Sequence, residues 1–156
     1  MRTALFIAAA LAVGCTDTSR DPIPLEPGDE AVYSAEVQDY VGLRCASLDC
    51  HGDQGRALRI YAKYGLRELA TLREQDVAPT EVAANVRAFA AFADGPPENN
   101  LALLKGLATS AGGISHVGGD IWLTTTDPGY QCILAFLSGQ SNATACADAL
   151  APVNVD

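Results

Sequence analysis

Two cysteines followed directly by a histidine form the most informative chemical motif of this chain, the segment CASLDCH at residues 45–51. Paired thiols beside an imidazole are the groups that attach c-type haem, because the thiols add to the haem vinyl groups and the imidazole binds iron. On this interpretation Cys45 and Cys50 form the thioethers, His51 is the proximal iron ligand, and the cofactor is covalently attached heme c. The gap between the cysteines holds four residues, which is longer than in the common motif.

Two other interpretations of the motif remain open. A Cys45–Cys50 disulfide would close a small loop and leave His51 as a surface residue. Alternatively, Cys45, Cys50, His51 and His116 supply the kinds of nitrogen and sulfur ligand that structural zinc takes. Neighbouring residues are awkward ligands for a single ion, so the zinc interpretation is the weaker of the two.

The candidates for a distal iron ligand are few. Met1 is the only methionine and lies in a segment expected to be removed, so no thioether remains. Lys63 and Lys105 would have to lose a proton whose pKa is ordinarily about 10.4. His116, the only other histidine, lies in the glycine-rich segment 110–120. Elimination leaves His116 or an open position, and we favour His116. Two histidine ligands predict a lower reduction potential than a methionine–histidine pair.

Three arginines follow the motif closely: Arg56, Arg59 and Arg67. A guanidinium binds a carboxylate in a forked geometry, so each arginine is a candidate partner of a haem propionate. The alternative at each position is a solvated surface side chain.

The N-terminus has the pattern of an export signal. Arg2 precedes an uninterrupted apolar run over residues 4–13, which is too short to span a bilayer. The run ends in LAVGC, which resembles the bacterial lipobox and implies cleavage before Cys15 and acylation of that cysteine. Several acyl chains on one residue anchor a protein firmly. Residues 1–14 are therefore predicted as a signal peptide, and residues 15–29 as a lipidated cysteine followed by a proline-rich spacer.

Export predicts an oxidising compartment in which disulfides persist. Besides the motif cysteines and Cys15, the chain has Cys132 and Cys146, and we expect these two to pair with each other, although counting alone does not fix connectivity. The formal net charge of −9 repels nucleic acid, so we expect no nucleic-acid partner.

The pattern along residues 30–150 predicts an all-α domain, and residues 151–156 form a short tail. A helix is expected from about residue 29 into Cys45, because apolar residues recur at helical spacing there. Further helices are predicted from Pro79 through an apolar stripe ending at Ala93, over residues 101–107, and over residues 130–138 after the N-cap Asp127. The only β-prone run is residues 121–125.

Two blocks carry a family resemblance: residues 45–67, with CASLDCHG, LRIY and GLR, and residues 103–139, with HVGG and FLSG. They resemble the single-haem cytochrome c domains of exported bacterial proteins, particularly the planctomycete cytochrome c type. The resemblance implies a small cytochrome c-like bundle of about four to five helices with long glycine-rich loops. It also implies Cys45 and Cys50 as thioether sites, His51 as proximal ligand and, with less weight, His116 as distal ligand.

The sequence therefore predicts a lipid-anchored c-type haem protein that carries single electrons in the cell envelope. Thr16 replaces the aspartate that marks inner-membrane retention in enteric bacteria, which favours the outer membrane, facing the periplasm. The redox partner protein is not identifiable from the sequence. A phosphate-binding loop and a Gly-x-Ser-x-Gly elbow are both missing, so we expect no enzyme. The alternative function is a haem-free, disulfide-stapled lipoprotein that serves as a binding or structural module.

Overall fold

The computed structural model describes residues 28–151, and this part of the chain is all-α, as the sequence predicted. No strand forms within it; the β-type pairings there are isolated bridges between Tyr61 and Leu66 and between Leu107 and Trp122. None of the described helices is long and apolar enough to cross a membrane. The predicted signal peptide, Cys15, most of the spacer and residues 152–156 lie outside the described residues.

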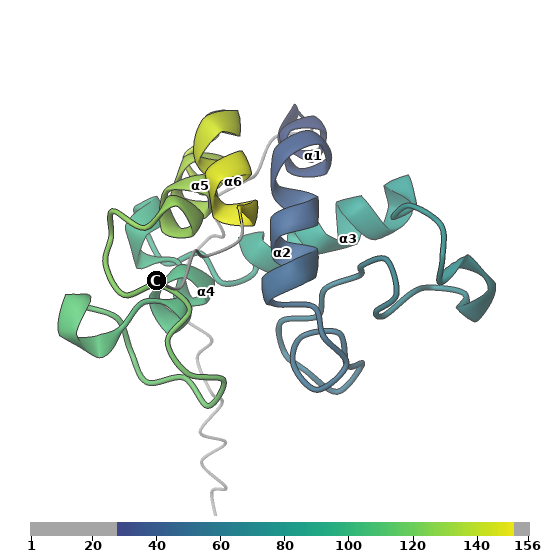
Figure 1. Cartoon of the computed structure of the whole chain (residues 1–156), viewed down its shortest axis with the longest axis horizontal. Helices are drawn as coiled ribbons and strands as arrows, with labels where there is room; N and C mark the ends of the chain where they lie inside the picture. Colours follow the sequence, from purple (N-terminus) through teal and green to yellow (C-terminus); the bar gives the residue numbers. More distant parts are fainter. Residues whose placement is uncertain (1–27, 152–156) are drawn as a thin grey trace, which may run out of the picture.

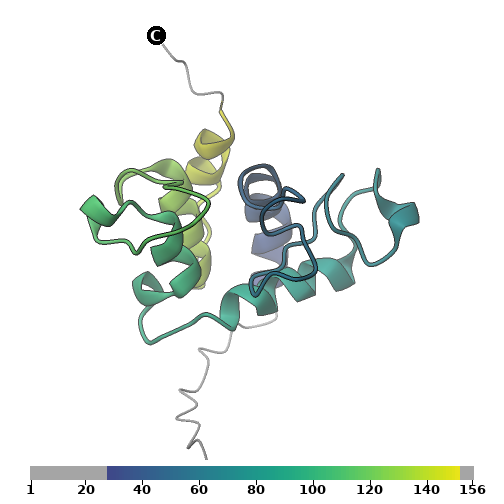
Figure 2. The same ribbon diagram turned by 90° about the horizontal axis from the view of Figure 1, so that it is seen from below.

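The predicted first helix is present as one continuous rod made of α1 (Gly28–Val32), a π-helical segment η1 (Tyr33–Val37) and α2 (Gln38–Arg44). Acidic residues occupy its first turn, where they favour the positive end of the helix dipole. Its buried face carries apolar residues at helical spacing, as expected: Tyr33, Val37, Tyr40 and Val41. In Figure 1 and Figure 2 the rod stands between α5 and α6 on one side and the segment 61–78 on the other.

Helix α3 (Pro79–Ala90) begins where the sequence predicted, with proline in its first turn. The Glu81 carboxylate accepts a hydrogen bond from the Ala78 backbone N–H at 2.9 Å, which satisfies one of the free donors at the helix start. Val82, Val86 and Phe89 are buried, as expected from the apolar stripe. The predicted extension of the stripe to Ala93 is wrong, because the helix ends at Ala90.

The C-terminal half contains α4 (Leu101–Gly106), α5 (Pro128–Leu137) and α6 (Ala143–Leu150), with short 3-10 turns η3 (Pro97–Asn99) and η4 (Thr109–Ala111). A further 3-10 turn, η2 (Ala70–Leu72), precedes α3. The Asp127 side chain caps α5 by accepting from the Gly129 N–H, as predicted. Helix α6 was not predicted; Asn142 caps it through the Ala145 N–H. The Cys132–Cys146 disulfide joins α5 to α6, which confirms the predicted pairing.

Three aromatic rings hold these layers together. Tyr33 of the first helix lies 5.3 Å from Phe136 of α5 and 6.1 Å from Phe89 of α3, measured between ring centroids. Phe89 and Phe136 meet edge to face at 6.0 Å. Tilted and edge-to-face pairs of this kind each add about 0.5–1.5 kcal/mol beyond the apolar area they bury. The cluster therefore fixes the first helix against both α3 and α5.

Candidate haem site

The four residues predicted to hold a cofactor come together around one cavity of about 370 Å³. Cys45, Cys50, His51 and His116 all line it, although His116 is far from the others in the sequence. Figure 1 shows the segments that carry them, the loop after α2 and the loop after η4, at the same end of the molecule. The volume lies within the usual range for small-molecule sites, roughly 300–1,000 Å³.

The walls of the cavity are apolar and its charged groups are all cationic. Apolar side chains from the first helix, α3, α4, α5 and the segment before α5 contribute, among them Val41, Phe89, Phe92, Trp122 and Ile133. Arg44, Arg56 and Lys105 are its charged lining residues, and no carboxylate lines it. This contrasts with the formal net charge of −9 for the whole chain. The cavity is therefore suited to an apolar ligand that carries negative charge.

His51 is half-buried and held from several directions. Its Nδ1 lies 2.8 Å from the Leu58 carbonyl oxygen, and its backbone carbonyl accepts from the Ile60 N–H at 2.8 Å. Burial lowers the pKa of the imidazole and outweighs the hydrogen bond to the Leu58 carbonyl, which raises it, while His116 and Arg56 add smaller lowering contributions. The ring is therefore neutral near pH 7. When Nδ1 donates to Leu58, Nε2 keeps its lone pair, which is the orientation that metal-binding histidines commonly have.

His116 lies in a tight turn within the loop that follows η4. Its Nδ1 is 3.2 Å from the Gly119 carbonyl oxygen, and its own carbonyl accepts from the Gly119 N–H at 3.0 Å. Gly119 has a positive φ of 82°, a conformation that glycine adopts without penalty. A Cβ on Gly118 would lie only 2.9 Å from the His116 ring. Glycine at positions 118 and 119 thus has a local steric and conformational basis.

The separation of the two imidazoles tests whether they fit a common metal ion. Their rings are nearly parallel, at 10°, with centroids 5.9 Å apart. An imidazole nitrogen binds a metal ion at about 2 Å and lies about 1 Å from its own ring centre, so two rings on opposite sides of one ion have centroids roughly 6 Å apart. The centroid separation is therefore of the size that one ion held by both His51 and His116 would require.

The two cysteines are free thiols, half-buried at Cys45 and exposed at Cys50. The alternative Cys45–Cys50 disulfide is therefore not formed. Burial, followed by the neighbouring Cys50, raises the pKa of the Cys45 thiol to about 12. Among residues 28–151 no group of three or more His, Cys, Asp and Glu side chains is arranged to hold a metal ion, which does not support the zinc alternative. Haem is compatible with this geometry because the porphyrin supplies the equatorial nitrogens itself.

The loop between the cysteines folds as a compact turn. The Cys50 and Gly52 N–H groups both donate to the Ser47 carbonyl at 2.9 Å, and the His51 N–H donates to the Cys45 carbonyl at 3.0 Å. A Cβ on Gly52 would lie 2.3 Å from the Ala46 carbonyl oxygen, so this position requires glycine. The turn brings Cys45 and Cys50 to the same cavity despite the longer gap between them.

The arginine predictions differ in outcome. Arg56 lines the cavity and donates to the carbonyls of Asp49, at 2.9 Å, and Cys50, at 3.2 Å. Arg59 is exposed and is not among the lining residues. Arg67 lies elsewhere, buried against Glu81, so its predicted role as a propionate partner is wrong.

The sequence prediction missed two cations of the cavity wall, Arg44 and Lys105. Both had a local signal. Arg44 directly precedes Cys45, and Lys105 shares a face of α4 with Leu101, one helical turn earlier, which also lines the cavity. Lys105 also donates from Nζ to the Ser115 carbonyl at 2.7 Å, next to His116.

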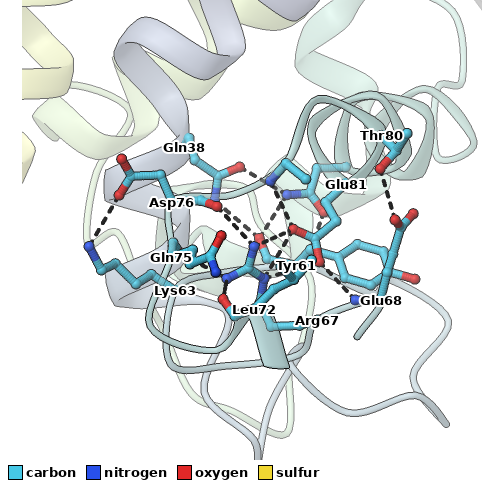
Figure 3. Close-up of polar contacts among 12 residues, drawn as sticks. Gln38, Tyr61, Lys63, Arg67, Glu68, Leu72, Gln75, Asp76, Thr80 and Glu81 are labelled. Atoms are coloured by element: carbon cyan, nitrogen blue, oxygen red, sulfur yellow. Dashed lines mark hydrogen bonds and ion pairs between the residues drawn. The ribbon is translucent and has the colours of Figure 1, made fainter. Parts of the chain in front are cut away.

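A buried polar network holds the segment that leads into α3, as Figure 3 shows. Arg67 donates from Nη2 to the Glu81 carboxylate at 2.7 Å, and both side chains are almost fully buried. Nε also donates to that carboxylate at 3.0 Å. Nη1 donates to the Leu72 and Gln75 carbonyls, and Nη2 donates to the Asp76 carbonyl as well. Burial opposes ionisation of Glu81, but hydrogen bonds from Arg67 and from two backbone N–H groups outweigh it and lower the carboxyl pKa. The network fixes residues 67–81, which contain no long helix.

Side-chain amides tie the chain at Tyr61 to α2 and α3. Asn85 of α3 accepts from the Tyr61 N–H at 2.8 Å and donates to the Tyr61 carbonyl at 2.9 Å. It also donates to the Gln38 side chain of α2 at 3.0 Å. Asn85 thus bonds both the N–H and the carbonyl of Tyr61. The preceding residue, Ile60, donates to the His51 carbonyl, so the packing of the helices fixes the position of His51.

Comparison of the chain with known protein families, with curated proteins and with solved structures finds no match.

Proposed function

We propose that this protein is a lipid-anchored, single-haem c-type electron carrier of the bacterial cell envelope. The observation that carries the proposal is the pairing of His51 with His116 across a cavity that both Cys45 and Cys50 also line. A haem group bound there supplies one-electron transfer between its ferrous and ferric states. The lipid anchor at Cys15 and the outer-membrane placement are parts of the same proposal that depend on the sequence alone.

Different residues of the cavity would hold different parts of the haem group. Cys45 and Cys50 would attach the group through their thiols, and His51 and His116, each with its Nδ1 against a backbone carbonyl, would bind its iron. Arg44, Arg56 and Lys105 are the cations available to propionates. The apolar walls lower the local polarity, which strengthens charge interactions inside the cavity.

The test is production of the full chain in cells that carry a c-type haem maturation system. We expect the intact mass of the mature protein to include one haem that survives acid extraction, and a Soret band in the visible spectrum. The matched variants are Cys45→Ser with Cys50→Ser, which should lose the attached haem, and Cys132→Ser with Cys146→Ser, which should keep it. A polypeptide mass without haem would overturn the proposal and favour the haem-free lipoprotein instead.

A further inference from the structure

A second hollow lies on the other side of the loop that joins the two cavity cysteines. It has a volume of about 730 Å³ and is bordered by the first helix, the loop residues Ala46, Ser47 and Leu48, and the segments around Tyr64 and Asp76. Cys45 and Cys50 face the haem cavity, whereas the residues between them line this groove. We call it the rear groove. The longer gap between the cysteines supplies part of its wall.

Large apolar side chains are exposed on the lining of the rear groove. Leu43 is 64% exposed, Leu48 54% and Tyr64 59%. Single exposed apolar residues are ordinary, but a group of them around one hollow is typical of an interaction site. Tyrosine is also among the residues that most often dominate binding energy at protein interfaces.

The backbone holds Tyr64 on the surface at a conformational cost. Tyr64 is the only residue other than glycine with a positive φ, 64°, among residues 28–151. A left-handed conformation is unfavourable for a bulky side chain and persists only where surrounding contacts impose it. Here the Tyr64 N–H donates to the Arg73 carbonyl at 2.8 Å, and the Gly65 N–H donates to Ala62 at 2.9 Å. The structure thus maintains a strained residue whose ring packs little against its own core.

The charges of the two hollows are opposite in kind. The haem cavity is lined by cations without a carboxylate, whereas Asp39 and Asp76 line the rear groove. Its one cation, Lys63, lies 3.1 Å from Asp76. Asp39 therefore adds uncompensated negative charge to a chain whose net charge is −9. A partner with basic groups around an apolar patch is attracted to the rear groove and repelled by the cavity.

We infer that the rear groove is the docking surface for a basic electron-transfer protein. The inference rests on the proposed function, because it names the class of partner that exchanges electrons with this carrier. A partner seated there lies against Ser47 and Leu48, in the same short loop that carries both attachment thiols. Leu43, Leu48 and Tyr64 supply the apolar contact, and Asp39 with Asp76 supplies the attraction.

The test uses the purified full chain and a basic mitochondrial cytochrome c as the probe, titrated at low ionic strength with isotope-labelled protein followed by NMR. We expect shifted resonances at the rear groove and binding that weakens with added salt. Leu48→Ser and Asp39→Lys should each weaken binding roughly tenfold. The matched controls Leu123→Ser and Asp120→Lys alter equally exposed residues beside the haem cavity and should change binding little.

Three outcomes would overturn the inference: no salt-dependent binding, shifts confined to the haem-cavity side, or equal effects of the groove variants and their controls. The binding readout does not depend on haem. A protein that lacks the Soret band but still binds the probe at the groove would therefore contradict the proposed function and leave the docking surface in place. A haem-loaded protein that binds the probe elsewhere would do the reverse.

Discussion

The two histidines of the cavity are supported in different ways. The segment that follows His51 is tied to α2 and α3 through Asn85, which bonds both Tyr61 and Gln38, and the Arg67–Glu81 pair fixes the chain beyond it. The loop with His116 is joined to α4 mainly by backbone hydrogen bonds, from the Ile114 N–H to Leu104 and from the Ile121 N–H to Gly106.

Both histidines are half-buried, but residues that surround them differ in exposure. Ile60, close after His51, is fully buried, whereas Val117, next to His116, is fully exposed. Local stability follows buried contacts rather than backbone hydrogen bonds alone. We conclude that the His51 side is preorganised by the core, and that the His116 side is the adaptable half of the site.

The largest effect should come from removing the Arg67 guanidinium. Arg67→Met leaves the Glu81 carboxylate buried without its charge partner, and breaking such a pair costs about 3–5 kcal/mol of unfolding free energy. Urea unfolding measures the change, and haem content reports on the His51 side. Lys63→Met is the control, because it removes the exposed partner of Asp76 and should have little effect. Equal small losses in both variants would contradict the proposed role of the buried network.

Replacing each histidine separately compares the two halves directly. His51→Ala should reduce bound haem at least about tenfold, since it removes the preorganised ligand beside the attachment thiols. His116→Ala should retain covalent haem and shift the iron to a high-spin state, read by optical or paramagnetic spectroscopy. An unchanged low-spin spectrum for His116→Ala would show that another group binds, with Lys105 as the nearest candidate on the cavity wall.

Glycine substitutions should separate stability from ligand geometry. Gly52→Ala forces a methyl group against the Ala46 carbonyl, and overpacking of this kind costs about 1–3 kcal/mol. Gly118→Ala presses on the His116 ring, which can move, so thermal stability should change little while the reduction potential shifts. Gly42→Ala serves as control, because its methyl group would meet Ala62 at an ordinary 3.5 Å. Large destabilisation by Gly118→Ala would contradict an adaptable loop.

The smallest effect is the pH dependence of the buried pair. The pKa of Glu81 is lowered in the folded protein, so its contribution to stability is complete above the unfolded pKa of about 4.3 and is lost as the pH falls through the folded value. Unfolding free energies measured from pH 6 to pH 3 should decline, and Glu81→Gln should reduce the slope. An unchanged slope in that variant would assign the acid sensitivity to other carboxylates.

The sequence predicted those elements whose signals are local. Apolar spacing predicted the first helix and α3, and Pro128 after Asp127 predicted the start of α5. Helix α6 has no such stripe, since its eight residues are mostly small, and only Asn142 marked its beginning. The π-helical segment also had no signal in the spacing.

The same distinction applies to the site. The cysteine–histidine motif is contiguous and could be recognised directly. Elimination selected His116, which lines the same cavity. Arg67 was assigned to the wrong partner because its carboxylate, Glu81, is supplied from 14 residues away by the start of another helix. Pairing over this distance depends on how the chain packs, and the residues next to Arg67 in the sequence do not reveal it.

The disulfide between α5 and α6 has a consequence for the order of events during maturation. Its cysteines are separated by 14 residues. Cys50, the exposed thiol, lies much farther from both of them in the sequence. Short loops close more readily than long ones, so random collisions favour Cys132 with Cys146 over mixed pairs. Early capture of those two sulfurs protects the other pair from scrambling. The α5–α6 hairpin therefore keeps Cys132 and Cys146 from forming mixed pairs with Cys45 or Cys50, the two thiols of the proposed haem attachment.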